Sequence, residues 1–257
     1  MPAQPRALLV DLDGVLYVED EALPGAREAV DRLRTGDLAL RFVTNTTAYS
    51  RVRTLDKLAG LGFEVEEREL VTPAALAVRH CREQGHALVA LVMNAEVKRD
   101  FAGLEETAGP ADAVIVGDLG AAFGYEVLND AFRQITEGAE LIALQKNRYW
   151  MRADGLALDV GPFVAALEYA TGREAYVVGK PARTFFDSVL GELGVEAAEA
   201  AMVGDDVESD IGGAQAAGLA GILVRTGKYR EDAVRASGID PVATVATIAE
   251  VPALLGI

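Results

Sequence analysis

The sequence predicts an α/β protein whose parallel sheets are covered by helices on both faces. Short apolar runs alternate with amphipathic helical stretches along the chain. Strands that alternate with helices form parallel sheets, because right-handed crossover helices connect successive strands. The length of 257 residues fits either one large α/β domain or two domains of ordinary size.

The individual elements follow from the apolar pattern. Buried strands are expected at residues 7–10, 39–44, 87–93, 113–117, 141–144, 175–178, 200–203 and 221–224. Helices are expected at residues 26–34, 51–61, 74–83, 125–137, 163–171, 184–193, 210–217 and 247–255. Pro24 and Gly25 precede the first helix, and Gly62, Gly85 and Gly194 are placed to end helices.

Any second domain must be an insertion with short hinges, because no Ser/Gly-rich linker and no repeat divides the chain. The candidate hinges lie at residues 71–73 and 171–173. They predict a core made of residues 1–72 and 173–257, and an inserted unit made of residues 73–172.

The charge balance excludes two classes of partner. The chain has 24 Lys and Arg against 40 Asp and Glu, a formal net charge of −16. This field repels nucleic-acid phosphates and anionic membranes, so we expect neither as a partner. The first residues contain no apolar run long enough for a signal peptide, and no later run approaches a membrane span. We therefore expect a cytoplasmic protein.

Cysteine and histidine are too scarce for several chemistries. Cys81 is the only cysteine, which excludes an internal disulfide and a thiolate zinc site. We expect it to be a small buried apolar residue on the first helix of the inserted unit. His80 and His86 do not have the spacing of metal ligands, and we expect both to be solvated on the surface.

Two aspartates follow the first predicted strand directly. Asp11 and Asp13 are separated by one residue, so their side chains leave the strand end on the same side, and Gly14 permits a sharp turn after them. One carboxylate in such a pair can attack phosphorus, while the other transfers protons to the leaving oxygen and from water. A lone pair of this kind is more often a polar turn that caps a strand.

Further polar groups follow other predicted strands. Thr44 and Asn45 end the second strand and offer hydroxyl, amide and backbone groups suited to phosphate oxygens, although ordinary helix capping explains them equally well. Lys180 follows the strand at 175–178, where its ammonium can neutralise a phosphoryl group or a carboxylate. It is not a P-loop lysine, because Pro181 replaces the required Ser or Thr.

A third acidic group follows the strand at residues 200–203. Asp205, Asp206 and Asp210 would join Asp11 and Asp13 if the two strands were adjacent. Five neighbouring carboxylates would repel one another and raise some of their pKa values. Mg²⁺ prefers such oxygen ligands, so the sequence predicts a magnesium cofactor at this edge of the sheet.

Four segments in this order resemble the motifs of the haloacid dehalogenase-like (HAD) hydrolase superfamily: DLDGVLY, FVTNTT, VVGKPA and GDDVESDIGGAQAAG. The long insertion between the second and third segments resembles the type-two cap of subclass IIA. The stretches KNRYWMRADGLALDVGPF and RTGKYR further resemble the group of phospholysine phosphohistidine inorganic pyrophosphate phosphatases and related hydrolase-domain proteins. The resemblance implies a Rossmann-like, doubly wound core with an inserted α/β cap that sets substrate specificity.

The resemblance also implies roles for the motif residues. Asp11 would be the nucleophile, and Asp13 the general acid and base, whose backbone carbonyl also binds magnesium. Thr44 and Asn45 would bind the phosphoryl oxygens. Lys180 would stabilise the charge on the nucleophile and the phosphate.

The remaining metal ligand implied by the resemblance is Asp205. Asp206 and Asp210 would support it as neighbouring carboxylates. One departure concerns Asp13, because the related proteins can have serine there. An intact acid/base favours a competent phosphatase, but it makes the transfer of those proteins' substrates less direct.

Specificity is expected to depend on the inserted unit. Lys146 and Arg148 form a closely spaced cationic pair that could bind a second anionic group of a substrate, although both could equally extend over the surface. Tyr149 and Trp150 are expected in the core of the cap or at an interface. Members of the subclass often dimerise through their caps, so the resemblance implies a homodimer.

The function predicted from these residues is a Mg²⁺-dependent phosphatase that hydrolyses a small phosphorylated metabolite through an aspartyl-phosphate, extending to pyrophosphate or phosphoamide bonds in the related group. Alternatives are other HAD phosphotransfer chemistry, such as a phosphomutase, and a non-catalytic phosphate-binding regulatory protein. Phosphomutases resemble a different cap arrangement, and a regulatory protein would have lost Asp11 or Asp13. Neither residue is lost.

Overall fold

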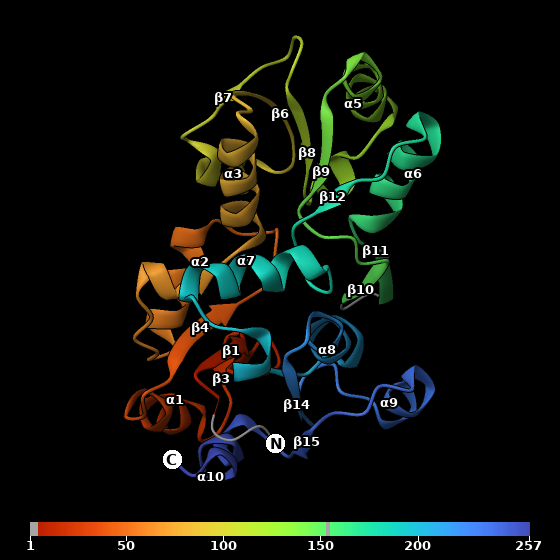
Figure 1. The fold of residues 1–257 in the computed structure, drawn as a ribbon. Coiled ribbons are helices and arrows are strands. Elements are labelled where there is room, and N and C mark those ends of the chain that lie inside the picture. The colour runs from red at the N-terminus through yellow and green to blue at the C-terminus, as the bar shows by residue number, and fades with distance from the viewer. Residues whose placement is uncertain (1–4, 153–154) are drawn as a thin grey trace. The chain divides into compact units, whose positions relative to one another are not determined.

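The computed structural model describes residues 5–152 and 155–257 (Figure 1). The chain divides into two compact units. Unit 1 comprises Met1–Thr44, Val52–Val71 and Lys180–Ile257, and unit 2 comprises Asn45–Arg51 and Thr72–Gly179. Each unit has its own parallel sheet, and the predicted α/β fold class is confirmed.

The far boundary of the inserted unit differs from the expected residue 172. Residues 173–179 belong to unit 2, because β12 (Tyr176–Val177) pairs in parallel with β9 (Glu140–Ala143) of that unit's sheet. The Gly172 turn that the sequence suggested as a hinge is only the C-cap of α6 (Gly161–Thr171). The chain re-enters unit 1 at Lys180.

Unit 1 contains a six-stranded sheet in which every neighbouring pair is parallel. Its order is β15 (Ala243–Val245), β14 (Ala220–Val224), β13 (Ala200–Gly204), β1 (Ala7–Asp11), β4 (Ala39–Val43) and β5 (Leu70–Val71). The chain moves from β1 outward to β5 and then from β13 outward to β15. The order therefore reverses at β1, and ligands of such sheets bind at the carboxyl ends of the strands at this point.

Helices cover both faces of this sheet (Figure 1). On one face α1 (Ala26–Arg34), α2 (Arg51–Gly60) and α10 (Val251–Leu255) pack on strand residues such as Leu8 and Phe42. The other face carries α7 (Arg183–Leu193) and α8 (Gly213–Ala217). The two central strands, β1 and β13, are buried along their whole length and, apart from Asp11 at the end of β1, consist of apolar residues and glycine, because both faces of the sheet are covered.

Shorter elements complete unit 1: β2 (Tyr17–Val18), β3 (Glu21–Ala22), the 3-10 turns Glu67–Glu69, Ala197–Glu199 and Ile248–Glu250, the π-helix η5 (Val207–Gly212), and α9 (Glu231–Ser237). Several of these are too short to produce a periodic pattern, and the sequence did not predict them. The helix expected at residues 210–217 is instead η5 followed by α8.

Unit 2 contains a five-stranded parallel sheet in the order β12, β9, β8 (Ala113–Val116), β6 (Leu88–Val92) and β7 (Glu105–Glu106). Its helices are α3 (Pro73–Gln84), α4 (Ala95–Lys98), α5 (Tyr125–Glu137) and α6, with 3-10 turns at Arg99–Phe101 and Gly120–Ala122. Helices α5 and α6 cover one face of the sheet and α3 covers the other (Figure 1). A separate antiparallel hairpin consists of β10 (Tyr149–Arg152) and β11 (Gly155–Leu158).

The prediction that both histidines are solvated is wrong. His80 is buried, its ring stacks on Tyr176, and its Nε2 lies 3.0 Å from Glu140. His86 Nε2 lies 2.7 Å from the same carboxylate. The carboxylate of Glu140 therefore contacts two imidazoles. The sequence does not predict these contacts, because Glu140 is 60 residues from His80 and 54 residues from His86. Cys81 is buried on α3, as expected.

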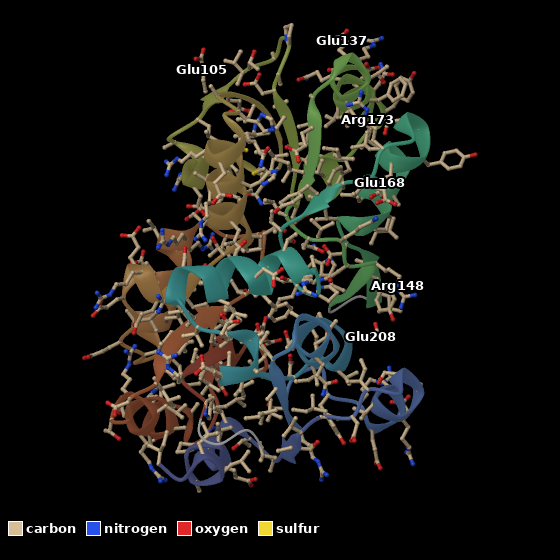
Figure 2. All side chains as sticks on the ribbon, viewed as in Figure 1. Glu105, Glu137, Arg148, Glu168, Arg173 and Glu208 are labelled. Carbon is tan, nitrogen blue, oxygen red and sulfur yellow. The ribbon has the colours of Figure 1, made fainter. Side chains whose placement is uncertain are left out.

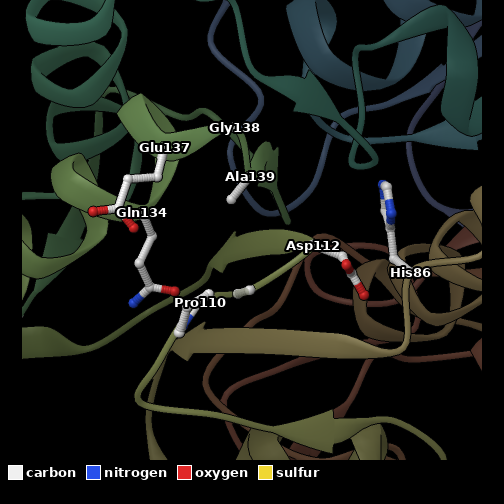
Figure 3. Close-up of a pocket in the computed structure, with 8 residues that line it drawn as sticks. His86, Pro110, Asp112, Gln134, Glu137, Gly138 and Ala139 are labelled. Carbon is white, nitrogen blue, oxygen red and sulfur yellow. The ribbon is translucent and has the colours of Figure 1, made fainter.

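A pocket of about 350 Å³ opens at the amino ends of the unit 2 strands (Figure 3). Its lining contains His86, Asp112, Gln134 and Glu137. None of the predicted site residues lines it. Asp112 has a structural task, because its Oδ2 accepts hydrogen bonds from the amides of Ala87 and Leu88 at the start of β6.

Among the described residues, no helix combines the length and the apolar character that crossing a membrane requires.

Candidate active site

The site is formed where β1 and β13 end side by side. The two strands pair in parallel with Val10 opposite Val203, so Asp11 at the end of β1 and Asp205 just after β13 come together. Both carboxylates are buried, and so is that of Asp210 in η5. Oxygens of these three carboxylates lie within 4.8 Å of one another, and in the described part of the chain they form the one group able to hold a metal ion.

The ammonium of Lys180 joins two of these carboxylates. Its Nζ donates hydrogen bonds to Oδ1 of Asp11 at 2.5 Å and to Oδ1 of Asp210 at 2.7 Å. Lys180 is 2% exposed, so solvent does not weaken these contacts. This is the cation that the sequence predicted to lie near a carboxylate of the site.

A loop after β14 positions the third carboxylate. The amide of Lys228 donates to Oδ2 of Asp205 at 2.7 Å. Oδ1 of Asp205 is buried and has no hydrogen-bond partner among the described residues. A buried carboxylate oxygen without a donor is costly, and a cation would satisfy it. The donor set and this orphaned oxygen both fit a hard divalent cation.

Two glycines, Gly14 and Gly227, allow the backbone to approach the carboxylate of Asp205 closely. A Cβ on Gly227 would lie 1.9 Å from Oδ2 of Asp205, and a Cβ on Gly14 would meet the same oxygen at 1.9 Å. Both glycines also have positive φ, +57° and +81°. The hydroxyl of Thr226 donates to the carbonyl of Gly14, which ties the two loops together. Only glycine at both positions allows the loops to close on the carboxylate.

The π-helix η5 positions Asp210. Asp206 caps this helix, with its side chain accepting from the amides of Glu208 and Ser209. The amide of Asp206 in turn donates to Oδ2 of Asp210 at 3.1 Å. A Cβ on Gly204 would lie 2.3 Å from Asp210, so a glycine is needed at the end of β13 for this carboxylate to approach. Single-turn π-helices often occur at functional sites.

Burial and mutual repulsion raise the pKa of two carboxyls. The pKa of Asp205 rises to about 8, because burial penalises its charge and because Asp11 and Asp210 are close. The pKa of Asp210 rises to about 6, since burial and its acidic neighbours outweigh the ammonium of Lys180. Burial opposes the charge of Lys180, but Asp11 and Asp210 raise its pKa overall. The site therefore contains more negative charge than its own lysine balances.

The remaining predicted site residues from the sequence motifs follow strand ends but lie outside this cluster of aspartates. Asp13 is exposed, two residues beyond the end of β1. Thr44 is buried directly after β4, and its amide donates to the carbonyl of Val71. Asn45 is the first residue of unit 2.

The two candidate specificity cations of unit 2 already have partners. Nζ of Lys146 lies 2.8 and 2.6 Å from the carboxylate oxygens of Glu168 on α6. Arg148 is exposed at the start of the hairpin (Figure 2). Its guanidinium lies 5.7 Å from the ring centre of Tyr149. The ion pair of Lys146 neutralises its charge and makes it a weak candidate for binding an anion.

Sequence reasoning noted residues 226–228 only within the stretch RTGKYR, as part of the resemblance, and gave them no role at the site. Thr226, Gly227 and Lys228 directly follow the predicted strand at 221–224, so their position at a strand end was a usable signal. The strand carries no acidic residue at its end, however, and the contact to Asp205 is made by a backbone amide. Backbone donors leave no trace in side-chain chemistry.

Comparison with known proteins identifies the family. A model described as haloacid dehalogenase-like hydrolase matches residues 8–105, and one described as HAD-hydrolase-like matches residues 177–251. The haloacid dehalogenase-like hydrolase domain-containing protein 2 of Bos taurus is 49% identical over 225 residues, which cover 88% of this chain and 86% of that protein. The chain belongs to the haloacid dehalogenase-like hydrolase family. The resemblance in the four motifs is thus confirmed.

Other members of this family share most of the chain's length. The phospholysine phosphohistidine inorganic pyrophosphate phosphatase of Homo sapiens is 42% identical over 231 residues, covering 88% of this chain and 84% of that protein. A p-nitrophenyl phosphatase from Archaeoglobus fulgidus superposes with a TM-score of 0.91 at 27% identity, covering 98% and 99% of the two chains. A glycerol phosphate phosphatase from Mycobacterium tuberculosis, solved in complex with magnesium, superposes with a TM-score of 0.81 at 30% identity, covering 95% and 75%.

The close packing of Gly227 against Asp205 gives a first prediction. Gly227→Ala should lower the free energy of unfolding by roughly 3 kcal/mol, because the new Cβ must displace Asp205 in addition to the left-handed backbone strain. Gly238→Ala is the matched control: φ is +68° there but nothing lies within 4 Å of the Cβ, so about 1 kcal/mol is expected. Urea denaturation measures both. Equal losses would show that the contact with Asp205 is not tight.

The raised carboxyl pKa values give a second prediction, for protein kept free of metal by a chelator. The pKa of Asp205 is raised to about 8 and that of Asp210 to about 6 in the folded state, whereas both are about 4 in the unfolded chain. Between these values the folded state binds more protons, so the free energy of unfolding should fall as pH rises from 5 to 8. Asp205→Asn should flatten the fall.

The control for this experiment is Asp187→Asn, which removes an exposed carboxylate paired with Arg183 on α7. It should leave the slope of unfolding free energy against pH as in the unmodified protein. Denaturant titrations at several pH values measure the slope. An unchanged slope in Asp205→Asn would contradict the assignment of the fall to this carboxyl.

Proposed function

We propose that this protein is a Mg²⁺-dependent phosphatase that hydrolyses a small phosphorylated metabolite through an aspartyl-phosphate on Asp11. The observation that carries the proposal is the buried group of Asp11, Asp205 and Asp210 with the single ammonium of Lys180. When all four groups are ionised, three negative charges and one positive charge leave −2. One divalent cation balances this charge.

The residues present fit magnesium. Asp11 and Asp205 would hold it, together with the backbone carbonyl of Asp13, and all of these donors are the hard oxygens that Mg²⁺ prefers. Support comes from the buried, unpartnered Oδ1 of Asp205. When bound, the ion would neutralise negative charge on the phosphoryl group. The magnesium complex of the similar glycerol phosphate phosphatase also supports this choice.

Asp11 acts as the nucleophile in this proposal. A carboxylate oxygen of Asp11 attacks phosphorus, the bond from phosphorus to the leaving oxygen breaks, and Asp13 donates the proton that the leaving oxygen needs. Lys180 holds the carboxylate of Asp11 in place through its 2.5 Å hydrogen bond. Its second hydrogen bond, to Asp210, fixes the direction of the ammonium.

Asp13 then reverses its role. Its carboxylate removes a proton from a water molecule, the water oxygen attacks phosphorus, and the bond between phosphorus and Asp11 breaks to release phosphate. The exposed position of Asp13 suits a group that exchanges protons with the leaving group and with water. Thr44 and Asn45 are proposed to bind the phosphoryl oxygens.

Unit 2 is proposed to act as a cap that selects the leaving group and excludes water. A homodimer formed through unit 2 belongs to the same proposal. Support comes from the hairpin of β10 and β11, where Tyr149, Trp150, Leu156 and Leu158 are each at least half exposed. The proposal also includes a cytoplasmic location, and neither nucleic acid nor membrane as a partner.

The names of similar proteins support a phosphatase over other chemistry. The similar proteins reported above include a p-nitrophenyl phosphatase, a glycerol phosphate phosphatase and an inorganic pyrophosphate phosphatase. Their substrates differ, whereas the phosphoryl group is common to all three names. We therefore propose that unit 1 carries the chemistry common to these proteins and that unit 2 sets the substrate.

Asp11→Asn should abolish phosphate release from p-nitrophenyl phosphate, because an amide cannot attack phosphorus at a useful rate. We expect a loss of at least about 10³-fold, together with a strict requirement for Mg²⁺ in the unmodified protein. Steady-state release of nitrophenol measures both. Turnover retained in this variant would refute the aspartyl-phosphate mechanism. The control is Asp187→Asn, which removes an exposed carboxylate on α7 and should retain full activity.

Asp13→Asn should slow hydrolysis by about 10²-fold or more, because the amide neither donates nor accepts the required proton. p-Nitrophenol is a good leaving group, so the breakdown of the covalent intermediate should be affected more than its formation. Rapid mixing should therefore show a burst of nitrophenol followed by slow turnover. Asp20→Asn is the control, since the Asp20 carboxylate is 96% exposed and pairs with Lys57. Unaltered rates in Asp13→Asn would remove the acid/base role.

A further inference from the structure

A second cation lies beside the cluster of aspartates in unit 1. Nζ of Lys228 is 3.7 Å from Oδ2 of Asp206, and the side chain of Lys228 is 64% exposed. The backbone of the same residue is anchored, because its amide donates to Asp205. Lys228 therefore combines a fixed main chain at the site with an ammonium that solvent can reach.

Two other cations of this loop have contacts outside the site. The guanidinium of Arg230 is paired with Asp232 at 2.6 Å. That of Arg225 lies 6.0 Å from the ring centre of Tyr229. The ammonium of Lys180 is buried and pairs with Asp11 and Asp210. Lys228 combines an ion-pair contact to an aspartate of the site with an ammonium that solvent can reach.

The contact between Lys228 and Asp206 is weak enough to be exchanged. A pair at 3.7 Å with an exposed ammonium gains little from its attraction in solvent. Asp206 does not depend on it, because its Oδ1 accepts from the amides of Glu208 and Ser209. The lysine can therefore turn to an arriving anion while Asp206 keeps its other hydrogen bonds.

The charge balance of the site favours such a cation for one class of substrate. The charges of a bound divalent cation and of Lys180 would be balanced by Asp11, Asp205 and Asp210 before any phosphate arrives. The protein as a whole has a net charge of −16, which opposes the approach of a multiply charged anion. A substrate with a second anionic group next to its phosphoryl group needs a further positive charge close to the site. Partial loss of hydration lowers the pKa of the Lys228 ammonium, but the nearby aspartates raise it overall, which supports this location.

We infer that Lys228 is a specificity-determining residue that binds the second anionic group of the substrate. The inference rests on the proposed phosphatase function and names its substrate class: phosphate esters or anhydrides with a phosphate or carboxylate beside the reacting phosphoryl group. The ammonium replaces its weak contact with Asp206 by a charge-assisted hydrogen bond to that group. No bond is made or broken by Lys228.

The test compares three substrates in Lys228→Gln. Inorganic pyrophosphate offers a second phosphate, phosphoglycolate offers a carboxylate, and p-nitrophenyl phosphate offers neither. Glutamine removes the charge and keeps the backbone amide that holds Asp205. We expect kcat/KM for at least one doubly anionic substrate, relative to that for p-nitrophenyl phosphate, to fall about tenfold. The fall should appear mainly in KM.

Two further variants complete the experiment. Lys228→Arg should restore most of the lost ratio, because it restores the charge. Lys98→Gln is the matched control: Lys98 is also a partly exposed lysine in an ion pair, with Glu106 in unit 2, and the ratio should stay as in the unmodified protein. A thermal unfolding curve for each variant verifies that it is folded.

The outcomes separate this inference from the proposed function. A selective fall in the pyrophosphate or the phosphoglycolate ratio supports the inference and identifies which anion Lys228 binds. Equal effects on all three substrates, or no hydrolysis of either doubly anionic substrate by the unmodified protein, would overturn it while p-nitrophenyl phosphate is still hydrolysed. Absence of Mg²⁺-dependent release from every substrate would overturn the proposed function itself.

Discussion

The buried ammonium of Lys180 is the contact on which the geometry of the site depends. It donates to Asp11 and to Asp210 and is almost without solvent contact. Removing it would leave buried carboxylates facing one another with no cation of the protein between them, which is costly in a medium of low polarity. Because its two acceptors come from β1 and η5, the lysine also fixes these two segments relative to each other.

The doubly wound topology explains why these residues meet. The strand order of the unit 1 sheet reverses at β1, so residues far apart in sequence follow neighbouring strands at one edge. Close approach then depends on glycine. Gly204 leaves room for Asp210, whereas Gly14 and Gly227 leave room for Asp205. The glycines let the backbone enclose the carboxylates closely. Burial, and after it the repulsion between neighbouring carboxylates, raises the pKa of Asp205 and Asp210.

Much of this arrangement could be predicted from sequence, because its signals are local. Asp11 and Asp205 directly follow apolar runs, and parallel strands place their carboxyl ends together. What could not be predicted depends on contacts between distant segments. The pairing of β12 with β9, which moves residues 173–179 into unit 2, is one such contact. The burial of His80 against Glu140 is another, since neither residue carries a pattern that points to the other.

The loop at residues 226–228 separates two requirements that would otherwise conflict. Its backbone holds Asp205 through the amide of Lys228, and this contact is independent of the side chain at that position. The side chain, in contrast, extends to the exposed rim of the site. A change of residue at position 228 can therefore alter the charge offered to a substrate without altering the hydrogen bond to Asp205. Gly227 has no such freedom, because any Cβ there would meet the carboxylate. Within two neighbouring residues, one position is restricted by the geometry of the site and the next is available to set its specificity.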